Sequence, residues 1–164
     1  MQAMNPELAA TLNRWKSKGD TIVFTNGVFD LLHAGHVTYL RGARDLGDRL
    51  VVAVNSDASV RTLGKGSDRP INDEESRKLV LEALRSVDVA VIFSSETPLE
   101  LIMQIRPDVL VKGGDYDPKV QDREAKNYIV GSCEVIDYGG KVAVIPFVKG
   151  HSTTLMLQKS RSKD

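Results

Sequence analysis

The sequence predicts a single α/β domain over residues 1–164, in which a five-stranded, mostly parallel sheet is flanked by helices as in Rossmann-like folds. Three observations support this prediction. Short apolar runs alternate with segments of helical periodicity, which is the arrangement of a parallel sheet joined by right-handed crossovers. The 164 residues suffice for one domain with its own core. Polar, glycine-containing motifs follow three of the apolar runs, and ligands of such sheets bind beyond the carboxyl ends of the strands.

The first predicted elements are a leading helix over residues 6–18 and a strand over residues 21–24. The apolar face of the helix consists of Leu8, Leu12 and Trp15. These positions recur with helical spacing, and Gly19 provides a stop. The apolar run at 21–24 is predicted to be a buried strand, which Asn26 and Gly27 are expected to end.

A second helix is expected over residues 35–46 because its apolar residues recur with a helical period. Those residues are Val37, Leu40, Ala43 and Leu46. Residues 49–55 form a nearly continuous apolar run, which is typical of a strand buried on both faces. A short helix or turn at 57–63 and a polar, glycine-rich loop at 64–70 follow.

The next helix is expected to begin at a cap formed by Asn72 or Asp73 and to end near residue 85. Its predicted inward face consists of Leu79, Val80, Ala83 and Leu84. Its predicted solvent face consists of Glu74, Glu75 and Lys78.

The remaining elements are strands at 89–93, 108–111 and 141–146 and helices at 97–105 and 152–160. Pro98 suits the first turn of its helix, because the missing N–H is not needed there. Residues 118–138 are expected to hold a helix and a short strand near 133–136. The polar tail at 159–164 is expected to fray.

Charge and composition argue against several classes of function. Basic and acidic residues balance at 22 each, so neither a nucleic-acid partner nor an anionic membrane surface is expected. No apolar run reaches membrane-spanning length, and the N-terminus lacks the apolar core of a signal peptide. The single Cys133 cannot form an intramolecular disulfide, which fits a reducing compartment. We therefore expect a cytoplasmic protein with no nucleic-acid or membrane partner.

His33 and His36, with Gly35 between them, lie where the first predicted strand passes into a helix. Backbone N–H groups and the positive end of the helix dipole meet at such a point and suit a phosphate. The imidazoles add donors, and Gly35 lets a ligand approach the backbone closely. The alternatives are packing at the helix start and a zinc site. Phosphate binding is preferred because the only cysteine lies about a hundred residues away and no third metal ligand is evident.

A second polar motif follows the strand at 108–111 and is expected at the same edge of the sheet. Lys112 supplies a cation there, and Gly113 and Gly114 let backbone N–H groups reach a ligand. A plain turn is the alternative interpretation of the glycines. Asp115 and Tyr116 are candidates for hydrogen bonds to sugar hydroxyls, or else for capping the turn.

A third motif begins the last predicted helix and consists of Ser152, Thr153 and Thr154. Their hydroxyl and N–H groups can donate to phosphate oxygens, although an ordinary N-cap would account for one of them. The glycine-rich loop is surrounded by three cations, Lys65, Arg69 and Arg77. A lid that carries cations onto a triphosphate is one interpretation of this loop, and solvated surface is the other.

These motifs fit nucleotidyl transfer, in which a substrate phosphate attacks the α-phosphorus of a nucleoside triphosphate. The attacking phosphate is already anionic, so no general base is required. Catalysis then consists of alignment and charge stabilisation, with Mg²⁺ bridging the phosphates. The sequence contains no Walker A lysine loop and no nucleophile–base pair, which argues against P-loop ATPases and hydrolases.

The sequence resembles the nucleotidyltransferase superfamily that carries the HxGH signature. His33-Ala-Gly-His36 resembles that signature, and Ser152-Thr-Thr154 resembles the second, C-terminal signature. Within the superfamily, the chain is most similar to the D-glycero-β-D-manno-heptose 1-phosphate adenylyltransferases of bacterial ADP-heptose synthesis. The similarity covers about residues 20–158. It is clearest at 46–59, 69–72 and 108–116.

The resemblance implies that ATP and heptose 1-phosphate react to give ADP-heptose and pyrophosphate, with Mg²⁺ as cofactor, for lipopolysaccharide or a related surface glycan. It implies that His33 and His36 bind the triphosphate and stabilise the transition state, and that Lys112 contacts phosphate. The C-terminal residues Ser152 to Thr154 would hold the β- and γ-phosphates.

The resemblance also implies roles for the loop after the first strand. Asn26, Gly27 and Phe29 would shape the floor of the nucleotide site. Asp30 would lie close to the phosphates or the metal, which the phosphates would mainly hold. Asp115 is the candidate for contact with the sugar.

Two alternatives stay open. The related glycerol-3-phosphate cytidylyltransferases carry an arginine shortly before their Ser-Thr-Thr motif; the aligned residue here is Phe147, which weakens the assignment to cytidylyl transfer onto a polyol phosphate. A non-catalytic nucleotide-binding module would keep the fold, but the histidines, Lys112 and the Ser-Thr-Thr motif are all present. By analogy with other proteins of this fold, we expect a homodimer.

Overall fold

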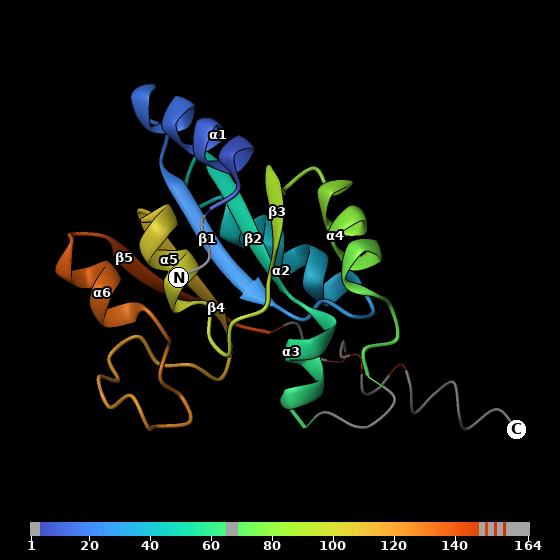
Figure 1. Cartoon of the computed structure of the whole chain (residues 1–164). Helices are drawn as coiled ribbons and strands as arrows, with labels where there is room; N and C mark the ends of the chain where they lie inside the picture. The colour runs from blue at the N-terminus through green and yellow to red at the C-terminus, as the bar shows by residue number, and fades with distance from the viewer. Residues whose placement is uncertain (1–3, 65–68, 148–149, 151–152, 154–155, 157–164) are drawn as a thin grey trace, which may run out of the picture.

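The computed structural model describes residues 4–64 and 69–147, together with Gly150, Thr153 and Met156. Within these residues the chain forms one sheet of five parallel strands with helices on both faces, which confirms the predicted fold class (Figure 1). The strands are β1 (Ile22–Gly27), β2 (Arg49–Asn55), β3 (Val89–Phe93), β4 (Val109–Gly113) and β5 (Lys141–Ile145). The helices are α1 (Pro6–Ser17), α2 (Ala34–Arg44), α3 (Asp57–Thr62), α4 (Glu74–Glu82), α5 (Leu99–Ile105) and α6 (Ser132–Asp137).

The strand order is β3-β2-β1-β4-β5, which makes β1 the central strand. Val23 of β1 pairs with Leu50 of β2 on one side and with Val109 of β4 on the other. The chain first builds outward from β1 to β3, and then returns to add β4 and β5 on the opposite side. In open parallel sheets a crevice forms where the order reverses in this way. A ligand site is therefore expected beyond the carboxyl ends of β1 and β4.

Two apolar layers cover the sheet (Figure 1). Helices α1, α5 and α6 cover one face, and their cluster with the strands includes Leu12, Trp15, Phe24, Ile102, Leu110 and Val135. Helices α2 and α4 cover the other face, and their cluster includes Leu40, Ala43, Leu50, Val52 and Leu81. Burial on both faces explains why β2 is apolar at nearly every position.

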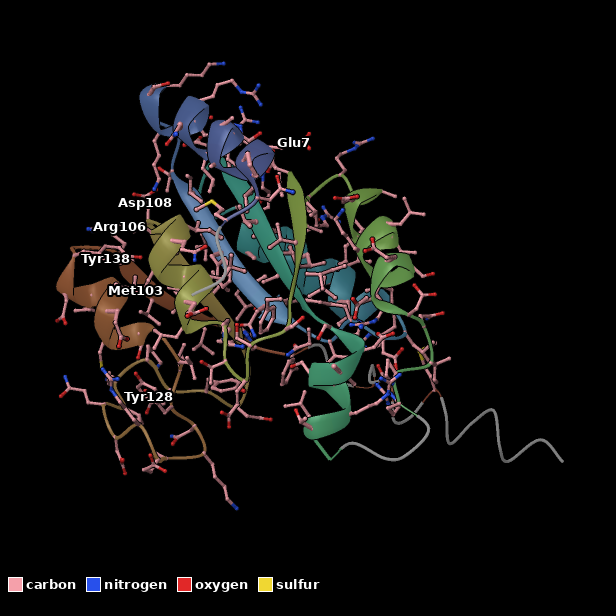
Figure 2. The ribbon with its side chains drawn as sticks, in the orientation of Figure 1. Glu7, Met103, Arg106, Asp108, Tyr128 and Tyr138 are labelled. Carbon is pink, nitrogen blue, oxygen red and sulfur yellow. The ribbon has the colours of Figure 1, made fainter. Side chains whose placement is uncertain are left out.

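The amino ends of the strands are fixed by polar and aromatic contacts. The backbone N–H of Ile22 donates to Asp108 Oδ2 at 2.7 Å, which joins the start of β1 to the start of β4. The Arg106 guanidinium lies 4.6 Å from the centre of the Tyr138 ring, and Tyr138 Oη donates to the Pro107 carbonyl at 2.8 Å (Figure 2). These contacts close the edge of the sheet opposite to the expected ligand site.

The face that α4 buries differs from the prediction. Arg77 and Leu81 are buried, whereas Leu79 is 69% exposed and Val80 is 48% exposed. Ala83 is exposed as well. Residues four apart share a helix face, so Arg77 and Leu81 define the inward stripe. The prediction was wrong for Leu79, Val80 and Ala83, because an arginine occupies an inward position of the helix. Leu84, just beyond the end of α4, is half-buried and packs against the apolar layer as expected.

One strand boundary and one element type also differ from the prediction. β1 continues to Gly27 instead of ending at residue 24, because β2 pairs with it as far as Val54. The segment 133–136, expected as a strand, lies in α6. α6 starts after Gly131, which adopts a left-handed φ of 88° as its N-cap.

The cap of α4 is Asp73, one of the two predicted residues. Its Oδ1 accepts the N–H of Ser76 at 2.8 Å.

The buried face of α2 was predicted in part. Leu40 and Ala43 are buried as expected, but Val37 and Leu46 are exposed and Tyr39 is buried instead. The Tyr39 hydroxyl finds a buried partner in Thr25, which a pattern of apolar residues does not reveal. Of the last predicted helix, only Thr153 and Met156 are described, and both are helical. Within the described residues, no helix combines the length and apolar character needed to cross a bilayer.

Candidate active site

A cavity of about 700 Å³ opens at the carboxyl ends of the strands. Segments at or beyond the ends of all five strands line it. Its lining includes Asn26, Gly27, Phe29, His33, Gly35, His36, Asn55, Glu96, Thr97, Lys112, Gly113, Tyr116, Lys126, Tyr128, Phe147 and Thr153. Members of the three polar motifs therefore lie in one cavity, as the topology led us to expect.

The two histidines stack on one another at the start of α2. Their ring centres are 3.9 Å apart with an angle of 26° between the planes. His33 is the N-cap residue with extended φ and ψ, and its side chain makes no capping hydrogen bond to the helix. The first turn of α2 thus retains N–H groups that no side chain of the N-cap satisfies, which is the arrangement that favours anion binding.

The pKa of His36 is lowered from 6.5 to about 4, first by burial and second by the neighbouring His33. His36 is therefore neutral at pH 7 and acts as a hydrogen-bonding group without a formal charge. Among the described residues, its Nδ1 is buried and has no hydrogen-bond partner. His36 also lines the cavity, so its ring can contact a ligand there.

The low pKa of His36 predicts a contribution to acid sensitivity. The unfolded chain takes up a proton at this side chain as the pH falls through 6.5, but the folded chain does so only near pH 4. The contribution of His36 to the free energy of unfolding is therefore complete above pH 6.5 and is lost as the pH falls toward 4. Denaturant unfolding over this range should show a steeper loss for the wild type than for His36→Gln. Parallel curves for the two proteins would contradict the low pKa.

The floor beneath the histidines is built by Phe29, which adopts a left-handed φ of 50°. Its ring meets that of His36 edge-on, with the centres 5.5 Å apart. A Cβ atom on Gly27 would lie 3.0 Å from Phe29 Cε2, so glycine is the residue that leaves room for this ring. Tyr39 also lines the cavity, and its Oη lies 2.7 Å from Thr25 Oγ1. Burial, which dominates over the Thr25 hydrogen bond, raises the pKa of Tyr39 to about 12.

Lys112 lies at the end of β4 with its Nζ 3.5 Å from the Asn26 carbonyl and 5.3 Å from the centre of the Tyr116 ring. Its ammonium group is thus held between β1 and β4, at the point where the strand order reverses. Asn26 Oδ1 is buried and makes no hydrogen bond to any described residue. Lys112 and Asn26 thus line the cavity together with the histidines.

The two glycines after Lys112 differ from each other: Gly113 lines the cavity, whereas Gly114 does not have the predicted role. The N–H of Gly114 donates to the Ile145 carbonyl at 2.9 Å, so it continues the pairing with β5 instead of pointing at a ligand. Cβ atoms on Gly113 and Gly114 would each lie 2.5 Å from the Phe147 ring. That ring is 60% exposed and lies across both glycines. The ring and the two glycines together form an apolar surface on the β4–β5 side of the cavity.

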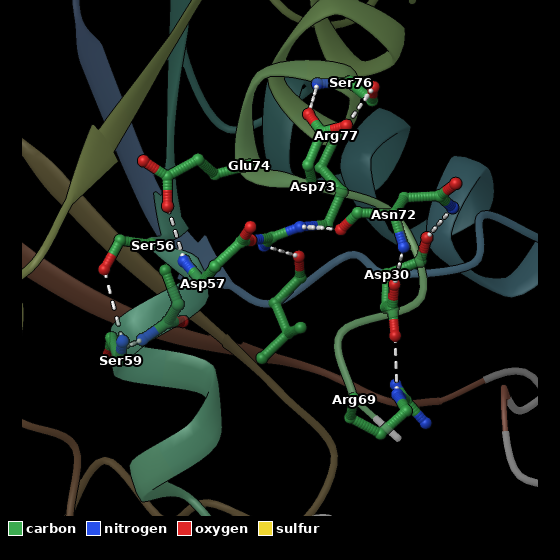
Figure 3. Close-up of polar contacts among 12 residues, drawn as sticks. Asp30, Ser56, Asp57, Ser59, Arg69, Asn72, Asp73, Glu74, Ser76 and Arg77 are labelled. Atoms are coloured by element: carbon green, nitrogen blue, oxygen red, sulfur yellow. Dashed lines mark hydrogen bonds and ion pairs between the residues drawn. The ribbon is translucent and has the colours of Figure 1, made fainter. Parts of the chain in front are cut away.

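Asp30, Arg69 and Arg77 lie in a polar network beside the cavity (Figure 3). Asp30 is buried and its carboxylate accepts from Arg69 Nε and from the backbone N–H groups of Ile71 and Asn72. The Arg77 guanidinium is buried as well and does not line the cavity. The expectation that Arg77 is a surface cation that reaches a triphosphate is therefore wrong.

Other predicted site residues are placed as follows. Thr153 lines the cavity, and its Oγ1 donates to the Leu31 carbonyl at 3.5 Å. Tyr116 lines it too, whereas Asp115 is exposed and lies outside the lining. Three predicted residues, Lys65, Ser152 and Thr154, lie outside the described residues.

Comparison with known proteins identifies the family. The chain matches the cytidylyltransferase-like family over residues 24–159, which is most of its length. The chain belongs to this family. The residues matched include both histidines, the whole of β2, β3, β4 and β5, and β1 from Phe24 onward.

Several relatives of this cytidylyltransferase-like chain are known. It is 50% identical over 155 residues to the bifunctional protein HldE of Methylobacillus flagellatus. This alignment covers 94% of this chain and 30% of that protein. It is 54% identical over 144 residues to the bifunctional protein HldE of Cronobacter sakazakii, with 88% and 28% covered. The chain thus spans about 30% of the length of these curated relatives.

A solved structure supports the same placement. The lipopolysaccharide core biosynthesis protein from Thermoplasma volcanium aligns with a TM-score of 0.61 and 32% sequence identity. The alignment covers 81% of this chain and 100% of that chain. The family expected from the histidine motif is thereby confirmed, with the cytidylyltransferase-like fold as its architecture.

Sequence analysis missed several residues that line the cavity of this cytidylyltransferase-like domain. They are Tyr39, Asn55, Leu63, Glu96, Thr97, Lys126, Tyr128 and Val130. Asn55 ends β2, and Glu96 and Thr97 follow β3, so the rule that ligands bind beyond strand ends would have found them. Tyr128 lies in the long segment between β4 and α6, whose residues show no clear periodic pattern (Figure 2).

The donor set of the site fits a magnesium ion held by a nucleotide better than one held by the protein. In the described part of the chain, no three His, Cys, Asp or Glu side chains are grouped as metal ligands. Glu96 is the one carboxylate among the described lining residues. Both oxygens of Asp30 already accept hydrogen bonds. Mg²⁺ commonly keeps few protein ligands when phosphates bind it, so this arrangement is compatible with the predicted cofactor.

Proposed function

We propose that this chain is a sugar-phosphate adenylyltransferase, which transfers AMP from ATP to D-glycero-β-D-manno-heptose 1-phosphate and releases pyrophosphate. The observation that carries the proposal is the stacked pair His33 and His36 beside Lys112 in the cavity at the β1–β4 reversal. About half of the sequence is shared with relatives named bifunctional protein HldE, and the structural neighbour is named for lipopolysaccharide core biosynthesis. The product would be ADP-heptose.

The reaction requires alignment more than acid–base chemistry. An oxygen of the sugar phosphate attacks the α-phosphorus of ATP, and the bond from that phosphorus to the pyrophosphate oxygen breaks. The neutral His36 donates a hydrogen bond to the α-phosphoryl group as charge develops, while Lys112 neutralises charge nearby. The start of α2 and Thr153 would hold the remaining phosphates. Bound Mg²⁺ would neutralise charge on the triphosphate.

The two sides of the cavity suit different substrates. The β4–β5 side carries aromatic rings, Tyr116 and Phe147, against which a nucleotide base can stack. The β2–β3 side carries polar groups, Asn55, Glu96 and Thr97, which match a sugar rich in hydroxyl groups. The histidines lie between the two sides, at the end of the central strand. We therefore place the adenosine over β4 and the heptose over β2 and β3, in preference to the earlier assignment of the sugar to Asp115 and Tyr116.

Removal of the Glu96 carboxylate should weaken sugar binding selectively. A hydrogen bond to a charged group contributes about 1.5–3 kcal/mol, so Glu96→Ala should raise the KM for heptose 1-phosphate by about 10–100-fold. The KM for ATP should stay close to the wild-type value. Steady-state kinetics with each substrate varied in turn would measure both. Glu124→Ala is the control, because Glu124 is exposed and lies outside the cavity lining. The assignment would be refuted if Glu96→Ala raised the KM for ATP as much as the KM for the sugar phosphate.

Pyrophosphate release tests the function itself. Each of ATP, CTP, GTP and UTP is combined with the α- or β-anomer of heptose 1-phosphate, or with glycerol 3-phosphate, in the presence of Mg²⁺. Turnover with ATP and the β-anomer alone is the expected result. Preference for CTP with glycerol 3-phosphate would overturn the substrate assignment. Nucleotide binding without turnover for any pair would favour a non-catalytic binding module.

We also propose that the enzyme works as a homodimer in the cytoplasm. ATP is available in that compartment, and the single Cys133 fits its reducing conditions. Analytical ultracentrifugation at micromolar concentration should give a species of twice the 18.0 kDa chain mass. A monomer throughout the concentration range would refute the dimer without affecting the proposed reaction.

A further inference from the structure

We propose that Arg77 is a positioning residue for the histidine pair, and that it acts through the backbone turn at residues 28–30. The inference rests on the proposed function, because the histidines are the groups that it positions. Arg77 does not line the cavity, so it does not touch substrate in this arrangement. Its contacts link three segments that are distant in the sequence, and one of them is the turn that leads to the histidines (Figure 3).

The Arg77 side chain is fully buried and each of its nitrogens has a different acceptor. Nη1 donates to the Val28 carbonyl at 2.8 Å. Nη2 donates to Asp57 Oδ1 at 2.6 Å, at the start of α3, and Nε donates to the Asn72 carbonyl at 2.9 Å. A planar guanidinium is the side chain that can satisfy three acceptors in fixed directions. Lysine offers one ammonium group and cannot reproduce this set.

Asp30 fixes the same turn from its other end. Its Oδ1 accepts from the backbone N–H groups of Ile71 and Asn72, each at 2.9 Å. Its own carbonyl accepts from Asn72 Nδ2 at 2.6 Å. Asn72 thus contacts both Asp30 and Arg77, which makes the two anchors parts of one network.

Phe29 is the residue between these anchors. It is a non-glycine residue at a φ of 50°, a conformation that persists only where the surroundings determine it. Arg77 donates to the carbonyl of Val28 before it. Asp30, the residue after it, is held by the backbone N–H groups of Ile71 and Asn72. The Phe29 ring then meets His36 edge-on, at 5.5 Å between centres. The orientation of His36 therefore depends on a guanidinium that lies outside the cavity.

The test compares Arg77→Met with a variant that destabilises the protein elsewhere. Leu12→Ala in α1 serves as the control, because Leu12 is buried in the apolar layer on the opposite face of the sheet. Both variants should lower the melting temperature. Arg77→Met should lower kcat by about 100-fold, as expected when a reacting group is misplaced by about 1 Å, with a smaller change in the KM for ATP. Leu12→Ala should keep the wild-type kcat.

Nuclear magnetic resonance supplies a readout that does not depend on activity. With ¹³C-labelled histidine, the His36 ring should show nuclear Overhauser effects to Phe29 in the wild type and in Leu12→Ala. These effects should weaken, and the His36 ring resonances should shift, in Arg77→Met. Should that variant fail to fold, Arg77→Lys provides the same comparison, since it keeps the charge and volume but not the three directions of donation.

Two results would overturn the positioning role. One is a kcat of Arg77→Met equal to that of Leu12→Ala, which would make Arg77 a purely structural residue. The other is a loss of kcat with the contact between Phe29 and His36 unchanged. If the wild type itself released no pyrophosphate with any substrate pair, the proposed function would fail, and the magnetic resonance comparison alone would decide the role of Arg77.

Discussion

Replacement of His36 with alanine is expected to lower kcat by about 10²–10³-fold while the protein stays folded. The imidazole lines the cavity as a neutral hydrogen-bonding group, and its buried Nδ1 has no partner among the described residues. A donor that acts on charge formed only in the transition state affects kcat and kcat/KM alike. Steady-state pyrophosphate release under ATP saturation measures this effect.

The neighbouring Val37 provides the control for this experiment. Val37→Ala changes a partly exposed side chain on the same helical turn that does not line the cavity. It should keep the wild-type kcat, and circular dichroism should confirm that both variants are folded. If His36→Ala turned over at the wild-type rate, the histidine pair would not be the catalytic centre and the site would have to be sought elsewhere.

Removal of the Asp30 carboxylate is expected to cause a large decrease in the free energy of unfolding. Its side chain is fully buried and accepts from Arg69 and from two backbone N–H groups. Asp30→Ala leaves these donors unsatisfied and leaves a charged guanidinium without its partner. The free energy of unfolding should fall by about 3–5 kcal/mol, the usual cost of breaking a buried ion pair on one side. Urea denaturation monitored by tryptophan fluorescence would measure it.

A solvated ion pair supplies the matched comparison for Asp30. Arg123 Nη2 lies 2.8 Å from Glu134 Oε1, but the arginine side chain is 60% exposed. Arg123→Met should therefore change the free energy of unfolding by at most about 1 kcal/mol. An equal loss in both variants would mean that burial does not determine the strength of the Asp30 contacts.

Local patterns in the sequence predicted most of the fold. The continuous apolar run of β2, the cap at Asp73 and the alternation of strands with helices all depend on neighbouring residues, and all agree with the structure. The convergence of the polar motifs followed from topology alone, since parallel strands end at one edge of the sheet.

The predictions that failed depend on contacts between distant segments. Arg77 looked like a surface cation because its acceptors lie 20 and 49 residues away, at Asp57 and Val28, and no local pattern indicates them. Because Arg77 lies on the inward face of α4, Leu79 lies on the exposed face of that helix. The fixed position of Gly114 likewise depends on its hydrogen bond to β5. Contacts of this kind require the three-dimensional structure.

The contact between Arg77 and Val28 also has a consequence for the order in which the protein matures during synthesis. The residues are 49 positions apart, so β2, α3 and the start of α4 must emerge from the ribosome before the arginine can reach the turn. A nascent chain that ends before residue 77 carries both histidines. It lacks the guanidinium that donates to the Val28 carbonyl in the turn before them. The contact is non-local, so its formation cannot be part of the folding of any single helix. Residue 77 is thus the earliest point in synthesis at which the turn at Val28 can acquire its contact with the guanidinium.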